Sequence, residues 1–269
     1  NFNEDIRISY QNLDRQAESY RKIRNTIRFI LGNLKDFSSK NNIEHNQLSP
    51  LEKFVRHKLY NLNNEINLAY NEFSFHRVFQ LILNFCSQEL SSLFFDVRKD
   101  ALYCDAEDSS VVKSTKTVMM DVFNCLIRWL SPIMPFTAEE AWQCWRDDIE
   151  KDEVLSCHLL KKIKLPDKWN NELLDNEWSK ILEIKNAFTY AVEQKRNIKE
   201  IKSSLEAKAL IYFKNKDYKK ISENLDLSEI LISANIEISD DFDDTFLFNS
   251  EEKKIGVKIF KEDGDKCPR

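Results

Sequence analysis

A group of basic side chains near the start of the chain could hold phosphate groups. At about 100° per residue in a helix, Arg21, Arg24, Arg28 and Lys35 fall within about 60° of one another. No Asp or Glu lies between Tyr20 and Lys35 to neutralise them. A cationic stripe of this kind is typical of a helix that contacts a nucleic-acid backbone, and equally of a solvated helix face. The residues of this segment alone leave both interpretations open.

The same segment also carries neutral hydrogen-bonding groups and an apolar face. Asn25 and Thr26 could read a chemical group that lies next to a bound phosphate. The apolar side chains follow the 3.6-residue period of a core-facing helix, which predicts one helix over residues 19–37. Its apolar positions are Ile23, Ile27, Ile30, Leu31, Leu34 and Phe37.

Other chemistry has little support in the sequence. The four histidines lack the spacing of a helix-borne zinc site, and the three glycines are too far apart to form a phosphate-binding loop. Cys157 and His158 form an isolated pair in a connecting segment, which we interpret as structural. Cys267 resembles the first half of a Cys-x-x-Cys zinc knuckle. A single thiolate cannot hold zinc, so we expect none to bind there in this chain.

Composition limits the class of protein. The 269 residues are 42% hydrophobic with a mean hydropathy of -0.52, and no apolar run approaches the roughly 20 residues of a membrane helix. The net charge of -5 argues against nonspecific coating of nucleic acid, so any such site must be local. Six dispersed cysteines favour a reducing compartment. The chain begins at Asn1 without a secretory signal, which we interpret as the boundary of a fragment.

Helical patterns continue to about residue 150. Ser49 and Glu52, with a proline between them, predict a capping box at the start of a second helix. Thr137 and Glu140 predict another capping box at the start of a fifth. Five helices of this kind form an antiparallel bundle, so residues 1–150 are expected to be one helical domain.

The pattern changes after residue 150. A long helix is expected over residues 169–197, followed by a small α+β junction domain, so that the second domain covers residues 151–266. Residues 267–269 would be the truncated start of a zinc-binding domain. The expected strands are residues 207–213, 230–233, 245–248 and 255–260, with a short helix over 218–224.

Several segments resemble one enzyme family. Tyr20–Leu34 resembles the signature that opens the anticodon-binding helical bundle of bacterial-type, class I isoleucyl-tRNA synthetases. The chain departs from the family pattern at Ala101, where the family has Arg, and at Lys202, where it has Gly. Valyl-tRNA synthetases have a different opening helix and no terminal cysteine knuckle. Later segments resemble the family's interhelical motif, proline elbow, junction and zinc-domain entry, in that order: Phe94–Asp105, Ser131–Trp142, Ser203–Ala207 and Lys266–Arg269.

The resemblance implies a C-terminal fragment of a cytoplasmic, monomeric ligase of protein biosynthesis. Such an enzyme activates isoleucine with ATP, transfers it to its tRNA and edits valine, using upstream domains of the same chain. The fragment would be catalytically inactive and would bind the anticodon stem and loop of isoleucine tRNA. No association with a membrane is expected. It would hold no cofactor, whereas the full-length enzyme would use ATP, magnesium and zinc, with Cys267 as a zinc ligand only there. The alternatives are a stand-alone RNA-binding helical module and a helical scaffold without an RNA role.

With that resemblance, the cationic stripe becomes the predicted tRNA-binding surface. Arg21, Arg24 and Arg28 are expected to contact phosphates or unstacked anticodon bases, and Asn25 to read a base edge or the backbone.

A second set of contacts is predicted further along the chain. Arg98 and Lys99 are candidates, with a salt bridge to Asp96 or Asp100 as the alternative.

Three aromatic residues could be platforms for stacked bases. Trp142 and Trp145 have helical spacing, and we expect at least one of them to be in the core. Tyr20 could be a platform or a packed residue.

Overall fold

The computed structural model describes residues 8–149, 154–223, 225–243, 245–248 and 254–262. The chain forms two compact units, which divide between residues 171 and 172, and each is described by itself. The predicted domain boundary at residue 150 lies earlier than this division.

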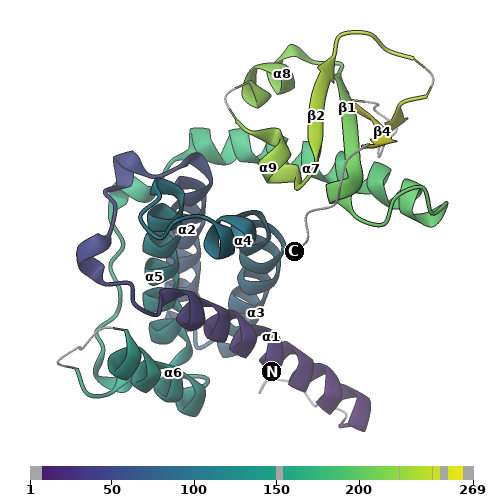
Figure 1. Cartoon of the computed structure of the whole chain (residues 1–269). Coiled ribbons are helices and arrows are strands. Elements are labelled where there is room, and N and C mark those ends of the chain that lie inside the picture. Colours follow the sequence, from purple (N-terminus) through teal and green to yellow (C-terminus); the bar gives the residue numbers. More distant parts are fainter. Residues whose placement is uncertain (1–7, 150–153, 224, 244, 249–253, 263–269) are drawn as a thin grey trace. The chain divides into compact units, whose positions relative to one another are not determined.

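The first unit is a helical bundle (Figure 1). Helix α5 packs against α1, α2 and α6, and α3 packs against α2. A π-helical stretch, η3, joins α3 to α4. The predicted helical bundle is confirmed. Its helices are α1 (Tyr10–Leu34), α2 (Pro50–Asn71), α3 (Phe75–Phe85), η3 (Cys86–Phe94), α4 (Phe95–Cys104), α5 (Ser110–Leu130) and α6 (Pro135–Asp148), and its short 3-10 turns are η1 (Ser39–Asn41), η2 (His45–Gln47), η4 (Cys157–Leu159) and η5 (Asp167–Trp169).

Helix α1 begins earlier and ends earlier than predicted. Ser9 caps its N-terminus, because the Ser9 hydroxyl accepts a hydrogen bond of 3.2 Å from the backbone of Asn12. The helix stops at Leu34, and Asp36 then takes a left-handed conformation with a φ of 67°. Phe37 is buried, as its apolar character predicts, but it lies beyond the helix.

The buried face of α1 fixes its rotation in the bundle. Ile23, Ile30 and Leu34 are fully buried, and Ile27 is nearly so. Burying each such side chain stabilises the fold by about 1.5–3 kcal/mol. The predicted apolar stripe is therefore confirmed, and the opposite side of α1 must face solvent.

Both predicted capping boxes are wrong. Ser49 makes no side-chain cap, and Glu52 is fully buried instead of turning back to the helix start. Helix α6 begins at Pro135, which precedes Thr137 by two residues. In both helices a proline occupies the first turn, where its missing N–H leaves one fewer donor to cap.

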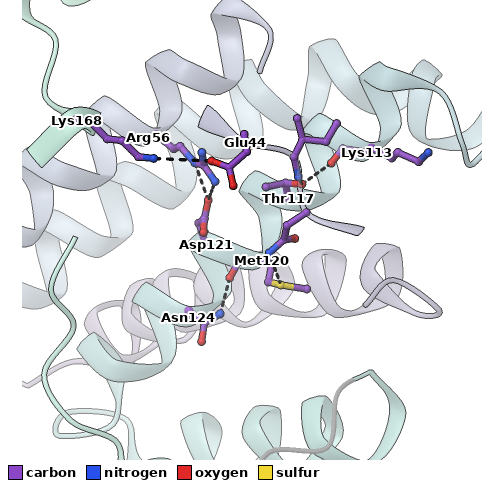
Figure 2. Close-up of polar contacts among 10 residues, drawn as sticks. Glu44, Arg56, Lys113, Thr117, Met120, Asp121, Asn124 and Lys168 are labelled. Carbon is purple, nitrogen blue, oxygen red and sulfur yellow. Dashed lines mark hydrogen bonds and ion pairs between the residues drawn. The ribbon is translucent and has the colours of Figure 1, made fainter. Parts of the chain in front are cut away.

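Polar contacts attach α2 and the loop before it to α5 (Figure 2). The backbone N–H of Ile43 donates to Thr117 Oγ1 at 3.0 Å. Arg56 of α2 forms an ion pair of 2.7 Å with Asp121 of α5. Both side chains of this pair are mostly buried, so it fixes how α2 and α5 pack.

The second unit contains the long helix α7 and a four-stranded mixed sheet with the strand order β2-β1-β4-β3. β1 is parallel to β2 and antiparallel to β4, which pairs antiparallel with β3. Helix α7 packs against β4, α8 and α9. The predicted α+β part is confirmed. Its elements are α7 (Glu172–Asn197), η6 (Ser204–Glu206), β1 (Ala207–Phe213), α8 (Lys216–Ser222), α9 (Leu227–Leu231), β2 (Asn235–Ser239), β3 (Leu247–Phe248) and β4 (Ile255–Lys261).

The strand predicted over residues 230–233 is wrong. Asp226 caps a short helix there, α9, by accepting a hydrogen bond of 3.1 Å from the backbone of Glu229. Ile232 has a φ of 55°, and this left-handed residue ends α9. The strand β2 begins only at Asn235, because a helix cap and a helix stop surround the apolar run.

The two departures from the family pattern, Ala101 and Lys202, can be located in this fold. Lys202 is not among the residues with positive φ, whereas Lys199 is, with a φ of 61°. The backbone N–H of Lys202 donates to Glu206 Oε2 at 3.0 Å. Ala101 lies in α4 and is partly exposed. Lys202 therefore does not occupy a backbone conformation that favours glycine.

None of the described helices combines the length and the apolar character that crossing a membrane requires.

Candidate nucleic-acid interface

Four basic residues of α1 and its C-cap residue, Lys35, form a surface that we call the cationic face: Arg21, Lys22, Arg24, Arg28 and Lys35. All except Arg24 are exposed and make no ion pair with any residue that the structure describes. The buried stripe on the other side of α1 holds them toward solvent. These charges therefore remain available to neutralise phosphates.

Arg24 has a protein partner. Its Nη2 atom lies 3.2 Å from Oε1 of Glu140 on α6, and the two side chains are 42% and 60% exposed. Exposed pairs of this kind contribute about 0–1 kcal/mol, so a phosphate can compete for Arg24. Beside this pair, Tyr20 Oη lies 3.1 Å from Thr137 Oγ1. The sequence around Arg24 contains no acid, but the fold brings one to it, Glu140 of α6.

A groove of about 420 Å³ lies between α1 and α6. Its α1 side combines cations with apolar groups, and Gly32 leaves open space where a Cβ would otherwise project. A groove with a basic wall and an apolar floor can accept a sugar or a base beside its phosphate. It is lined by Arg24, Ile27, Arg28, Leu31 and Gly32 of α1, by the C-cap residue Lys35, and by Thr137, Glu140, Ala141, Cys144 and Ile149.

A second groove, of about 570 Å³, lies between α1 and η3. Asn25 is exposed there, and its amide makes no hydrogen bond with a described residue. The half-buried ring of Phe29 lies beside it, with its centroid 4.6 Å from that of Phe95. Free amide donors and acceptors next to an aromatic ring can recognise an unstacked base. The other lining residues are Lys22, Thr26, Ser87, Gln88, Ser91 and Ser92.

The π-helical stretch that forms the far wall of this second groove is not visible in the sequence. The hydroxyls of Ser91 and Ser92 each donate to the carbonyl five residues earlier, at 2.8 Å. Single π-helical turns occur frequently at functional sites. The sequence analysis therefore missed the residues of this wall, and it also missed Lys22, which belongs to the same acid-free run.

Arg98 is not at the surface. Its side chain is 4% exposed, and its Nε and Nη2 atoms donate to the two carboxylate oxygens of Glu52 at 2.7 and 2.9 Å. Thr115 donates a further hydrogen bond of 3.0 Å to Glu52. The predicted tRNA contact at Arg98 is therefore wrong, and the carboxylate that holds its guanidinium is that of Glu52. Lys99 is exposed, and its role stays a prediction.

Both candidate tryptophan platforms are in the core. Trp142 is 1% exposed, and its indole N–H donates to the carbonyl of Val154 at 3.1 Å. Trp145 is 3% exposed and stacks on Phe123 with a centroid distance of 4.7 Å. The expectation that at least one is in the core is confirmed, and neither can stack on a base. Tyr20 remains 38% exposed.

Metal ligands come together at one place in the described part of the chain. One ligand atom each from Glu139, Cys157 and His158 lie within 4.8 Å of one another. The sequence shows the Cys157–His158 pair, but only the fold brings Glu139 to it. The predicted zinc ligand Cys267 lies outside the described residues.

Comparison with known proteins agrees with a nucleic-acid interface. Residues 52–211 match the family model described as the anticodon-binding domain of tRNA ligase. The chain is similar to the isoleucine–tRNA ligase of Pelagibacter ubique, with 39% identity over 100% of the chain and 28% of the relative. It is also similar to the isoleucine–tRNA ligase of Bartonella quintana, with 38% identity over 99% of the chain and 27% of the relative. The enzyme of Caldicellulosiruptor saccharolyticus is 36% identical over 98% of the chain and 28% of the relative. The chain thus spans just over a quarter of the length of these relatives.

Proposed function

Because this chain belongs to the family of anticodon-binding domains of tRNA ligases, we propose that it holds the anticodon stem and loop of isoleucine tRNA. The observation that carries the proposal is the cationic face of α1, on which Arg21 and Arg28 are exposed and unpaired with any described residue. The isoleucine–tRNA ligases that match the whole chain support the choice of this tRNA over an unspecified RNA.

Phosphate contacts by the cationic face position the RNA. Each arginine or lysine that neutralises a phosphate releases condensed counterions, which makes binding favourable at low salt. The chain as a whole has a net charge of -5, so its other surfaces repel a polyanion. Attraction is therefore concentrated where the unpaired cations lie.

The groove between α1 and η3 provides base recognition. Anticodon bases are single-stranded, so their edges and faces are open to a protein. Asn25 can donate to and accept from a base edge, and the ring of Phe29 beside it offers an apolar surface. In this arrangement Arg21 and Arg28 fix the backbone while Asn25 reads a base.

The catalytic steps belong to other parts of a longer ligase. We place this chain in an enzyme that attaches isoleucine to its tRNA in an ATP-dependent reaction, in the cytoplasm and as a monomer. ATP, magnesium and zinc serve the whole enzyme, with Cys267 as one zinc ligand. This chain contributes recognition and alone has no catalytic activity.

The test is binding of a fluorescent RNA stem-loop with an isoleucine anticodon, measured by anisotropy. We expect Arg28→Ala to weaken binding by at least about fivefold, because a phosphate contact is lost. Lys40→Ala removes an exposed positive charge outside the cationic face and serves as the matched control. Equal affinities for the two variants would overturn the assignment.

A further inference from the structure

The connecting segment after α6 is held against that helix by a set of hydrogen bonds. The side chain of Gln143 donates to the carbonyl of Leu155 at 2.7 Å. The carboxylate of Glu139 accepts from the hydroxyl of Ser156 at 2.9 Å and from the backbone N–H of Cys157 at 3.0 Å. The start of η4 is therefore fixed over the second turn of α6, and this brings three metal-ligating side chains together.

We propose that Glu139, Cys157 and His158 form a zinc-binding site, with water as the fourth ligand. Their ligand atoms lie within 4.8 Å of one another. Zinc bonds of about 2.0–2.3 Å place tetrahedral ligands roughly 3.3–3.7 Å apart. His158 is exposed, so its ring can rotate to bring its nitrogen to zinc-binding distance from the other two ligands without disturbing the core. A carboxylate, a thiolate and an imidazole are all zinc ligands, and three protein ligands with a water is a common zinc arrangement.

The proton that zinc displaces can be identified. The sulfur of Cys157, a free cysteine, lies within 4.8 Å of a carboxylate oxygen of Glu139. When zinc binds, an S–Zn bond forms, the S–H bond breaks and the proton passes to water. The bound ion then balances one thiolate and one carboxylate, so no net charge remains among the three ligands. Because the thiol must lose its proton before the sulfur can bind zinc, metal affinity should rise with pH.

The surroundings orient the ligands before metal binds. Gln143 donates to Oε1 of Glu139 at 2.6 Å, while Ser156 and the Cys157 backbone hold Oε2. Partners of this kind fix the direction of a ligating carboxylate, and their loss typically weakens metal affinity by about 10–100-fold. Cys157 itself is 1% exposed, so its sulfur is fixed by packing. The metal would join the connecting segment to α6 and is independent of the RNA contacts on α1.

The test is titration of the whole chain with Co²⁺, whose absorption reports coordination, in a Cys267→Ser background that removes the terminal thiol. We expect one Co²⁺ per chain, a thiolate charge-transfer band, displacement by zinc and release of about one proton per metal. Cys157→Val should abolish the band, and His158→Ala should weaken affinity by at least about tenfold. Cys144→Ser, an exposed cysteine on α6, is the matched control and should change nothing.

A parent chain without the thiolate band, or a Cys157→Val chain that keeps it, would overturn the proposal. Circular dichroism shows whether Cys157→Val is folded. If it is not, His158→Ala decides, because that side chain is exposed and its replacement leaves the core intact. Unchanged metal affinity in His158→Ala would then contradict the site.

Discussion

Arg28 and Arg98 have the same side chain and the same sequence-based prediction, but they lie in opposite surroundings. Arg28 is exposed on α1 and has no partner among the described residues. Arg98 is buried, and two hydrogen bonds join it to Glu52, which is itself fully buried. The two arginines differ in the source of the negative charge that neutralises them. Inside the bundle another helix supplies a carboxylate, whereas at the cationic face a bound ligand would have to supply the negative charge.

Arg24 lies between these two cases. Its partner Glu140 is on the neighbouring helix, but both side chains remain largely exposed. Solvent screens the pair, so removing one of its two charges costs far less free energy than removing one charge of the buried pair. A cation in this position can therefore exchange a protein carboxylate for a phosphate.

The largest expected effect is on the buried pair. Arg98→Met leaves the carboxylate of Glu52 buried without its charge partner, which should lower the free energy of unfolding by about 3–5 kcal/mol. Urea denaturation followed by circular dichroism measures it. Arg28→Ala, which removes an exposed charge, should change stability by less than about 0.5 kcal/mol.

A matched double variant sharpens that result. Glu52→Leu combined with Arg98→Met replaces both charges by apolar groups and should recover most of the lost stability. If Arg98→Met is as stable as Arg28→Ala, the distinction between interior and surface arginines fails.

A smaller effect on stability is expected at Glu139, whose carboxylate is stabilised in its charged form by hydrogen bonds. Burial acts to raise its pKa, but hydrogen bonds from Gln143, Cys157 and Ser156 outweigh burial and bring the pKa from 4.5 to about 2. Because the folded pKa is depressed, this stabilisation is complete above about pH 4.5 and is lost as the pH falls towards 2. Glu139→Gln should lower the free energy of unfolding by about 1–2 kcal/mol at pH 7, after allowance for solvent screening, and by less at pH 3.

Urea unfolding of both chains at the two pH values measures this difference. Glu140→Gln, at the adjacent and more exposed glutamate, is the control for the loss of one carboxylate from α6. A deficit for Glu139→Gln that is the same at pH 7 and pH 3 would contradict the account.

The smallest expected effect is on the exposed pair. Glu140→Gln releases Arg24 and removes a negative charge from the groove, so affinity for the RNA stem-loop should rise about two- to threefold. Glu72→Gln breaks another exposed pair, with Arg77 at 3.8 Å, and should leave affinity nearly unchanged. Equal gains in the two variants would mean that the net charge matters and the position does not.

Much of the bundle follows from periodicity in the sequence. The positions Ile23, Ile27, Ile30 and Leu34 recur with the helical period, and all four are buried. The strand over residues 207–213 was likewise predicted by its apolar run and matches β1. Local spacing is enough in these cases because one segment alone determines which face is apolar.

Contacts between distant segments could not be predicted in this way. Glu52 and Arg98 are 46 residues apart, and nothing in either segment shows that they meet. Glu140 neutralises Arg24 across 116 residues, so an acid-free run does not ensure an unpaired cation. The angular position of Arg28 was visible in the sequence, but the absence of a described partner required the fold.

The most direct test of the cationic face is the salt dependence of RNA binding. The logarithm of the stem-loop affinity is measured against the logarithm of salt concentration for the parent chain and for Arg21→Ala combined with Arg28→Ala. If both arginines neutralise phosphates, the double variant should bind more weakly and its slope should be smaller in magnitude by about two. An unchanged slope would contradict the claim that this face of α1 holds the RNA backbone.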